Sequence, residues 1–438
     1  MDGETVVVAG AGLAGLVAAR HLAEAGADVT VFERRPEVGG RVRSRERDGF
    51  TFDRGFQVLF TGYPAVRREL DLDALDMRYF SPGAVIARPG KRSTLSDPVR
   101  DPRATLSTLL NDEVTVTDKL RTLLLRQHVA SQSEDGIFAA EDDSIRAYLD
   151  EWGFSEGYIE NFVAPFYGGI TLDRSLSTSK RVFEYTFKAM SEGEIGLPAD
   201  GMGAVTDQLA AKARAAGAEI VTDAGVESID DETRDDEEPV DYGYAHPVTV
   251  TAGGEDVEAD RVVVATDPKE ARRLTDVELI PTEARSSVTQ YYRLPKREKL
   301  GTRKKILLNA GDDSPNIVVP VSDVAPEYAP DGDDELLCAT FLGSAALDRD
   351  ASDLLEATRD ALESWYESDF PALESLHTER VEFAQFAQPP GIHDALPDHI
   401  APRGRTYLAG EYTAWSSIQG AMRSGREAAE KVRADAER

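Results

Sequence analysis

Residues 5–41 read TVVVAGAGLAGLVAARHLAEAGADVTVFERRPEVGGR, and this stretch decides the fold. Its first part, Thr5–Ala9, is a run rich in β-branched residues, which is typical of a strand. A glycine-rich turn follows, and residues 16–25 have a helical spacing that ends at Gly26. Asp28–Phe32 is a second strand-like run. The order of strand, turn, helix and strand predicts a β-α-β unit that begins a parallel sheet.

The turn Gly10-Ala11-Gly12-Leu13-Ala14-Gly15 fits the pattern G-x-G-x-x-G. In that pattern the first glycine permits a tight turn, the second lets a pyrophosphate approach the backbone, and the third lets the helix pack on the strand. The helix that follows presents free N–H groups and a positive dipole end to phosphates. Glu33 ends the next strand, where a carboxylate suits ribose hydroxyls. We therefore expect an adenine dinucleotide to contact Gly10, Gly12, Leu13, Ala14, Gly15 and Glu33.

The chain continues after Glu33 as Arg34-Arg35-Pro36-Glu37-Val38-Gly39-Gly40-Arg41. Adjacent glycines let the backbone approach a flat ligand closely, and a guanidinium group matches phosphate oxygens. An acid, an arginine two positions later and then Gly-Gly-Arg resembles the pattern of the flavin-containing amine oxidase, protoporphyrinogen oxidase and phytoene desaturase superfamily. The matching residues are Glu33, Arg35, Gly39, Gly40 and Arg41. Residues 52–57 resemble the family segment that leads toward the substrate domain.

The resemblance continues along the chain. Residues 198–203 are similar to the family's Pro-x-Gly-Gly-Met turn, with Asp200 in place of the usual glycine. Residues 261–266 resemble the strand beneath the cofactor, and residues 408–411 and 418–421 match the closing flavin motif, in which Glu411 stands where Asp is frequent. The resemblance implies that the last helix aims its N-terminus at the flavin. It implies further cofactor contacts from Arg34, Val226, Gly410, Glu411, Ser417, Ile418 and Ala421.

These motifs favour FAD over NAD. A nicotinamide dehydrogenase has no use for Gly-Gly-Arg or for the closing motif, and no second G-x-G-x-x-G is present. The closing segment contains no cysteine, so we expect the FAD to be held without a covalent bond. The resemblance implies an α/β fold with a Rossmann-like, GR2-type FAD-binding domain and a discontinuous α+β substrate domain. We expect residues 1–60, 195–270 and 395–438 in the first domain, and residues 61–194 and 271–394 in the second.

Beyond the first β-α-β unit, sequence patterns predict the remaining elements. Helical patterns dominate residues 106–190 and recur at 204–216, 353–368 and 418–434. Strands are expected at 219–222, 225–229, 248–251, 261–265, 282–294, 305–319, 336–342 and 406–409. The acidic run 230–241 lacks the spacing of a calcium loop, so we interpret it as a solvated hairpin loop.

The resemblance implies an FAD-dependent oxidoreductase that transfers hydride from a substrate C–H bond to the flavin. This chemistry needs no obligatory acid or base, and no catalytic side chain is evident. Gln57, Tyr167 and Trp415 are candidates to face the substrate, although a packing role is favoured for Tyr167. The lysine that amine oxidases place beside the flavin would fall near residues 286–290, which contain none. Trp415 has no evident second aromatic partner, and no metal site is expected.

Three functions remain open. The first is oxidation of a large apolar substrate, either an isoprenoid, a carotenoid or a porphyrinogen. The second is amine oxidation, and the third is a flavin-free escort or binding protein, against which the intact phosphate and closing motifs count. The middle region contains Phe154, Tyr158, Phe162, Phe166, Phe183, Tyr185 and Phe187. We expect most of them to be ordinary core and some to line a long apolar cavity, with an apolar surface patch nearby for contact with a membrane or carrier.

Composition sets further limits. The 438 residues suggest two domains. The formal net charge of −31 is spread along the chain, which favours adaptation to molar salt over an acidic binding surface and argues against nucleic acid as a partner. The single cysteine, Cys338, lies in an apolar run and is expected to be a buried strand thiol. No signal peptide or membrane-spanning run is evident, so we expect a cytoplasmic protein with peripheral membrane contact.

Overall fold

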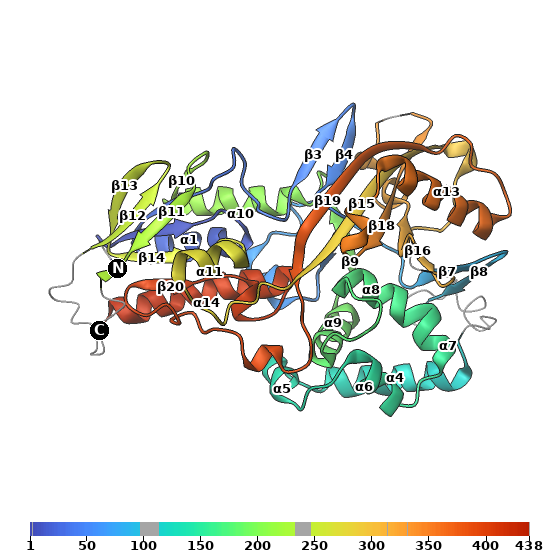
Figure 1. Cartoon of the computed structure of the whole chain (residues 1–438), viewed down its shortest axis with the longest axis horizontal. Helices are drawn as coiled ribbons and strands as arrows, with labels where there is room; N and C mark the ends of the chain where they lie inside the picture. Colours follow the sequence, from blue (N-terminus) through green and yellow to red (C-terminus); the bar gives the residue numbers. More distant parts are fainter. Residues whose placement is uncertain (2, 97–113, 233–246, 313, 331, 438) are drawn as a thin grey trace.

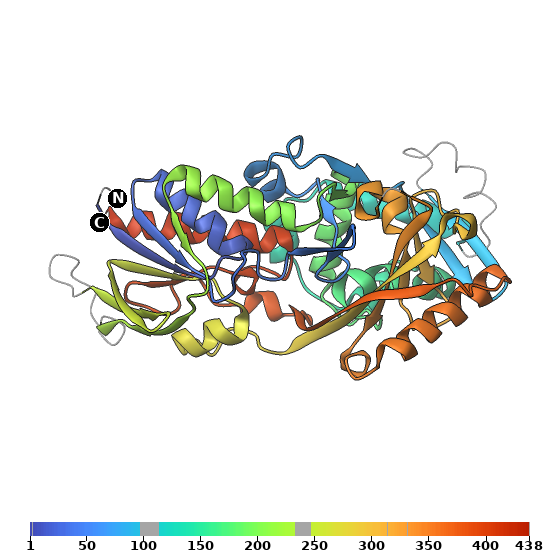
Figure 2. The same cartoon turned by 90° about the horizontal axis from the view of Figure 1, so that it is seen from above.

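The computed structural model describes residues 1, 3–96, 114–232, 247–312, 314–330 and 332–437. The molecule is elongated, and both chain termini lie at the same end of it (Figures 1 and 2). At that end lies a parallel sheet of five strands in the order β10-β2-β1-β14-β20. Its strands are β1 (Thr5–Ala9), β2 (Asp28–Phe32), β10 (Glu219–Val221), β14 (Arg261–Val264) and β20 (Thr406–Leu408). The predicted α/β class is therefore confirmed.

The side chains of β1 alternate between two layers that cover this sheet. Val6 and Val8 pack among the residues of helices α1 (Leu13–Glu24), α10 (Gly203–Ala216) and α14 (Ile418–Ala436). Val7 and Ala9 pack on the other face. That face is covered by the antiparallel strands β11 (Val226–Asp230), β12 (Val248–Ala252) and β13 (Glu255–Ala259), next to α11 (Pro268–Thr275). Both faces are apolar, as expected of a parallel sheet that is buried on its two sides.

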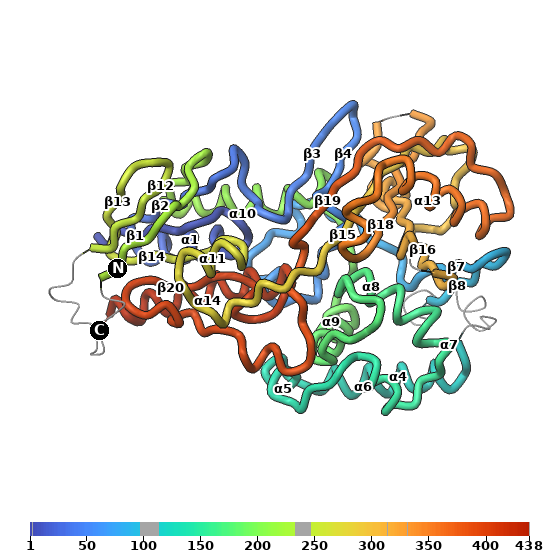
Figure 3. Tube along the Cα trace, in the orientation of Figure 1, coloured from blue at the N-terminus to red at the C-terminus, as the bar shows by residue number. Residues whose placement is uncertain are grey.

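A seven-stranded sheet, in the order β19-β15-β18-β17-β16-β7-β8, forms the other end of the molecule. The long strand β15 (Ala284–Pro295) pairs antiparallel with β18 (Asp334–Leu342) and with β19 (Glu374–Phe386), and Figure 3 shows β15 and β19 running together toward the middle of the molecule. The remaining strands are β17 (Ile317–Val319), β16 (Ile306–Asn309), β7 (Ala84–Arg88) and β8 (Lys91–Leu95).

The two faces of this sheet have different neighbours. Tyr292 and Leu337 share a core with Leu362 and Trp365 of α13 (Ala351–Tyr366). Tyr291 and Cys338 face the opposite way and belong to the large core that also contains the first helix. Cys338 is fully buried, and burial raises the pKa of its thiol well above the ordinary value. The expectation of a buried strand thiol is confirmed.

Helices gather below the seven-stranded sheet (Figure 1). They are α4 (Val116–Ala130), α5 (Glu134–Ala139), α6 (Ile145–Glu151), α7 (Glu156–Tyr158), α8 (Ala164–Thr171) and α9 (Lys180–Glu192). A π-helical turn, η2 (Ile159–Val163), joins α7 to α8 in one continuous segment. Such turns shift the side chains that follow them and are frequent near binding sites.

Short elements connect the two ends. They are the hairpin β3 (Ser44–Arg47) and β4 (Phe50–Asp53), the strands β5 (Leu59–Phe60), β6 (Met77–Tyr79) and β9 (Ile195–Pro198), and the helices α2 (Pro64–Glu69) and α12 (Val321–Val324). The buried carboxylate of Asp53 accepts hydrogen bonds from Ser44 Oγ, Met202 N and Tyr328 Oη. Asp53 therefore ties the hairpin to the start of α10 and to the segment after α12.

Most expected elements are present, with some differences. The first helix starts at Leu13 rather than residue 16, because the glycine turn runs directly into it. The sequence patterns missed the strands between residues 44 and 95 and also β19, whose charged residues hide its period. Most of the acidic run 230–241 lies outside the described residues. The helical region expected at 106–190 is described from residue 114 onward. The parallel sheet takes its strands from the three segments assigned to the FAD-binding domain, whose limits stay a prediction.

Candidate active site

The glycine turn after β1 has the geometry that a phosphate-binding turn requires. Gly10 has φ +103°, and a Cβ there would lie 2.8 Å from the carbonyl oxygen of Ala265. A Cβ on Gly15 would lie 1.9 Å from the carbonyl oxygen of Gly10, so helix and strand approach too closely for any side chain. A Cβ on Gly12 would meet nothing within 4 Å. Gly12, beside which the pyrophosphate is expected, therefore has open space next to it. Gly10 and Gly15 are instead needed for the close packing of the backbone.

Glu33 lies at the end of β2, beside this turn. Its carboxylate is 5% exposed and accepts hydrogen bonds from the backbone N–H groups of Ala11 and Arg35, each at 3.0 Å. These bonds fix the orientation of the carboxylate and leave further lone pairs on both oxygens. Glu33 borders the same cavity as the glycine turn, so it is placed as a ribose ligand requires.

The loop Gly39-Gly40-Arg41 lies against the glycine turn. Both glycines have positive φ, +111° and +59°, and a Cβ on Gly40 would lie 3.4 Å from Gly12 Cα. Arg41 Nη1 donates to Glu411 Oε1 at 2.5 Å and to the carbonyl oxygen of Ala384 at 3.1 Å. The first and last motifs of the chain therefore meet in an ion pair, although 370 residues separate Arg41 from Glu411.

The closing motif ends in α14, whose first turn borders the cavity. Ser417 is its N-cap, and the Ser417 hydroxyl accepts a hydrogen bond from Gly420 N at 2.8 Å. A Cβ on Gly425 would lie 2.2 Å from the carbonyl oxygen of Ala14, so α14 packs directly on α1. The positive end of α14 therefore faces the space in which negative charge would develop on a reduced cofactor.

One cavity of about 1630 Å³ joins these motifs to the helices of the other end. Of the seventeen predicted cofactor contacts, Gly15 alone does not border it, because Gly15 faces Gly10 instead. The cofactor contacts that border it are Gly10, Gly12, Leu13, Ala14, Glu33, Arg34, Arg35, Gly39, Gly40, Arg41, Val226, Gly410, Glu411, Ser417, Ile418 and Ala421. Among the buried polar atoms on its wall that have no hydrogen-bond partner are Gln57 Oε1 and Ser416 Oγ. The open glycine and these atoms fit a polar dinucleotide ligand.

The far half of the cavity is aromatic. Six of the seven aromatic residues named from the middle of the sequence line it, and all seven also belong to the large core or pack against it, as expected. They are Phe154, Tyr158, Phe162, Phe166, Phe183 and Phe187. They come from α7, the π-helical turn, α8, α9 and the loop before α7. The inward faces of these elements line a ligand space as well as a core. Tyr185 is the exception, since its hydroxyl donates to Glu134 and its ring stacks on Tyr63.

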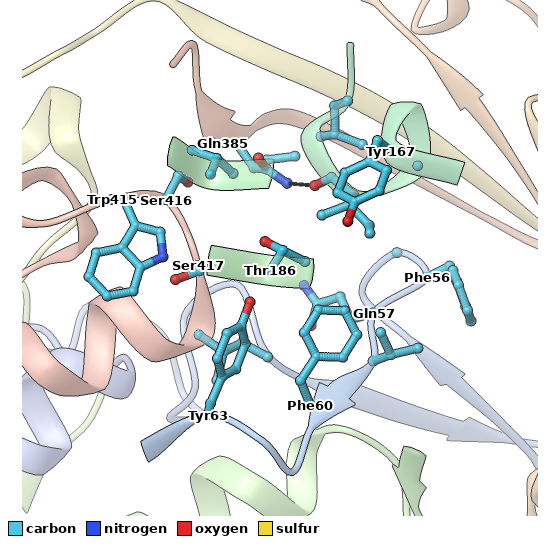
Figure 4. A pocket seen from close by; sticks show the side chains of 18 of the residues that line it. Phe56, Gln57, Phe60, Tyr63, Tyr167, Thr186, Gln385, Trp415, Ser416 and Ser417 are labelled. Atoms are coloured by element: carbon cyan, nitrogen blue, oxygen red, sulfur yellow. Dashed lines mark hydrogen bonds between the residues drawn. The ribbon is translucent and has the colours of Figure 1, made fainter. Parts of the chain in front are cut away.

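The three candidate substrate-facing residues all border the cavity (Figure 4). Gln57 donates from Nε2 to the carbonyl oxygen of Arg41 at 3.2 Å. Trp415 stacks on Phe138 with ring centroids 4.8 Å apart and meets Tyr185 edge-on at 5.0 Å. Tyr167 is buried, and its hydroxyl has no partner. Figure 4 also shows lining residues that the sequence patterns did not identify, namely Phe56, Phe60, Tyr63, Thr186 and Gln385.

Two described lysines, Lys119 and Lys269, line the cavity. On β15 the lining residue is Ser287, and residues 286–290 contain no lysine. Lys269 borders the nucleotide half, with Nζ 5.8 Å from the ring of Phe383. Lys119 borders the other half from α4. Among the described residues no group of three or more His, Cys, Asp or Glu side chains could hold a metal, and no described helix is long and apolar enough to cross a membrane.

Three features border one cavity beside the parallel sheet: the phosphate-binding turn, the acid at the end of β2 and the N-terminus of the closing helix. Together they define a dinucleotide-dependent oxidoreductase. The chain belongs to the family described as flavin containing amine oxidoreductase, whose model matches residues 13–433. The enzyme is therefore an FAD-dependent oxidoreductase, and the flavin-free alternative is set aside.

Relatives of known function agree with this class. A carotenoid 3,4-desaturase of Haloarcula japonica is 26% identical over 324 residues, which are 67% of this chain and 61% of that protein. Protoporphyrinogen oxidase 2 of Arabidopsis thaliana is 27% identical over 212 residues, which are 48% of this chain and 41% of that protein. The chain thus matches less than two thirds of the length of either relative. Cyclohexylamine oxidase from Brevibacterium oxydans shares the fold, with a TM-score of 0.69, 18% identity and full coverage of both chains.

Proposed function

We propose that this protein oxidises a large, apolar substrate of the isoprenoid, carotenoid or porphyrinogen kind. Bound FAD supplies the chemistry by accepting a hydride from a substrate C–H bond. The observation that carries the proposal is the aromatic half of the cavity, which opens directly into the nucleotide half. Ligand sites bury most of a ligand in a largely apolar cleft, and a cavity of about 1630 Å³ has room for a long molecule beside a dinucleotide.

The protein's own groups would orient and enclose the reactants. Arg41 and Glu411 form a charged pair beside the glycine turn, where a pyrophosphate and a ribityl chain would lie. The first turn of α14, which borders the cavity, would present its N–H groups to the flavin. The rings of Phe162, Phe166 and Phe183 would exclude water from the substrate. The absence of a lysine in residues 286–290 and the desaturase relative also support an apolar substrate over an amine.

Anaerobic mixing tests this proposal. The FAD-loaded enzyme is mixed without oxygen with lycopene, with protoporphyrinogen IX, and with putrescine or cyclohexylamine, while the visible absorbance of the flavin is followed. We expect bleaching by a polyene or a porphyrinogen and none by the amines. Bleaching by the amines alone, at a rate fast enough for turnover, would replace this proposal with amine oxidation.

The surface of α4 supports peripheral contact with a membrane as the source of such a substrate. Four of its residues are exposed apolar side chains, namely Val116 (82%), Leu120 (58%), Leu123 (57%) and Leu124 (51%), and the first three also line the cavity. The one acid of the helix, Asp118, is buried and caps its N-terminus, while Lys119, Arg121 and Arg126 give it basic character. A basic helix with an exposed apolar face binds the interface of anionic lipid bilayers.

Vesicle sedimentation tests the role of α4. We expect the protein to pellet with vesicles of anionic phosphatidylglycerol, and a variant carrying Leu120→Gln and Leu123→Gln to remain in solution. Leu279→Gln is the matched control, because Leu279 is 61% exposed and does not line the cavity. Equal pelleting of the double variant and the control would remove α4 from the proposal. Dimers lost in the double variant would make α4 a contact between copies of this chain.

A further inference from the structure

Tyr167 is an unusual residue on the aromatic wall of the cavity. It lies on α8, its side chain is 3% exposed, and its hydroxyl has no hydrogen-bond partner. Among the described tyrosines, Tyr167 alone has a hydroxyl oxygen that is itself buried and without a hydrogen-bond partner. Within the same cavity, for example, Tyr158 Oη lies 3.1 Å from Thr122 Oγ1. Figure 4 shows the hydroxyl of Tyr167 directed into the cavity.

An unpaired buried hydroxyl is costly. Burying such a group without a partner costs roughly 1–3 kcal/mol, and a phenylalanine would avoid that cost at this position. The ring of Tyr167 packs on Phe183 at 4.5 Å and on Phe166 at 5.5 Å, so its apolar contacts do not require the oxygen. The hydroxyl therefore points to a partner that arrives with a ligand.

The surroundings of Tyr167 restrict the chemistry of that partner. The neighbouring parts of α8, α9 and the π-helical turn contribute Val163, Ile170, Leu172, Val182 and Phe183 to the cavity wall. None of these side chains carries a charge that would balance a carboxylate or an ammonium group of the ligand. Burial also raises the pKa of Tyr167 well above the ordinary value, so the phenol stays a neutral donor. A neutral donor in an apolar wall suits a neutral oxygen acceptor.

We propose that Tyr167 is a specificity-determining residue that donates a hydrogen bond to a neutral oxygen, a hydroxyl or a carbonyl, on an otherwise apolar substrate. This inference rests on the proposed function and narrows it, because it selects an oxygenated long-chain substrate over a pure hydrocarbon. Sites that hydrogen-bond a ligand oxygen discriminate against analogues that lack it, since the protein group is then left unpaired.

Binding of paired probes tests this inference. Farnesol and geranylgeraniol, each against its deoxy hydrocarbon, are titrated into the FAD-loaded enzyme from cyclodextrin, and the shift of the flavin absorbance gives Kd. We expect the wild type to prefer the alcohols. In Tyr167→Phe the preference should fall about tenfold, the effect of losing one buried hydrogen bond. Tyr158→Phe is the matched control, because Tyr158 lines the same cavity with a paired hydroxyl, and it should keep the preference.

A second measurement guards against a folding defect. Because the hydroxyl has no partner within the protein, Tyr167→Phe should melt at the same temperature as the ligand-free wild type or higher. An unchanged preference in Tyr167→Phe overturns the inference, and so does a changed flavin spectrum without any probe, which would assign the phenol to the cofactor. Equal binding of alcohols and hydrocarbons by the wild type overturns it while the apolar-substrate function stands. Failure of the wild type to bind either kind of probe overturns both.

Discussion

Asp53 is a buried carboxyl group, 4% exposed, and its burial has a consequence for stability. Loss of hydration raises its pKa to about 6 from an ordinary value of 3.8, against the opposing effect of its hydrogen bonds. The folded protein therefore binds a proton at Asp53 more tightly than the unfolded chain does. Between these pH values the contribution of Asp53 to the free energy of unfolding falls as the pH rises, and it is constant above them.

Asp53→Asn removes this dependence. The stability of the variant relative to the wild type should improve as the pH rises from 4 to 7, by up to about 3 kcal/mol for a shift of this size. Urea unfolding at several pH values measures it. The difference in the free energy of unfolding between variant and wild type at any one pH also contains the lost hydrogen bonds. The change of this difference with pH is therefore the quantity to compare. Asp48→Asn, at an exposed position of the same hairpin, is the control. Parallel curves for Asp53→Asn and the wild type would contradict the assignment.

A second prediction concerns the side chain of Arg41 and its effect on FAD affinity. Arg41→Ala should weaken FAD binding about tenfold or more, because a charge-assisted contact is worth roughly 1.5–3 kcal/mol. The buried carboxylate of Glu411 would also lose its partner and repel the phosphates. Titration of FAD into the ligand-free protein measures the affinity. Arg45→Ala, at an exposed position that does not line the cavity, should leave it unchanged. Equal affinity in both variants would make Arg41 structural only.

The glycine turn between β1 and α1 predicts different effects for substitutions at Gly12 and Gly15. Gly12→Ala should fold with unchanged stability in the absence of FAD, because the added methyl group meets nothing, and yet bind FAD weakly because it occupies the open phosphate position. Gly15→Ala should destabilise the ligand-free protein, because its methyl group would collide with the carbonyl oxygen of Gly10. Thermal melts and FAD titrations of the two variants separate these effects. A stable Gly15→Ala protein would contradict the close packing of α1 on β1.

The nucleotide half of the site can be predicted from the sequence, and the substrate half cannot. The nucleotide half is built from contiguous turns, in which glycines and charged residues have fixed spacing, so Gly10–Arg41 could be identified locally. The substrate half combines side chains from separate helices with Val381 and Gln385 of β19. That strand alternates charged and apolar residues, and its pairing with β15 stabilises it. Such contacts are set by tertiary packing, which no local pattern records.

At the scale of the whole molecule, the excess of acidic residues predicts dependence on salt. With a formal net charge of −31, self-repulsion should destabilise the folded state at low ionic strength. At 1 M salt the screening length falls to about 3 Å. The melting temperature should therefore rise steeply with KCl. Sucrose at equal osmolality, which does not screen charge, should raise it less. A flat or falling curve in KCl would assign the acidic residues another purpose.

Cys338 has a practical consequence for measuring motion in this protein. It is the single thiol of the chain, and it is buried in β18. Its raised pKa keeps it protonated and therefore unreactive toward maleimides. A cysteine introduced at the exposed position Gln127 of α4 would then be the sole target for an environment-sensitive dye. With Cys338 left in place, fluorescence from that dye would report whether the helix leaves water for lipid, on the same sample whose flavin reports the chemistry.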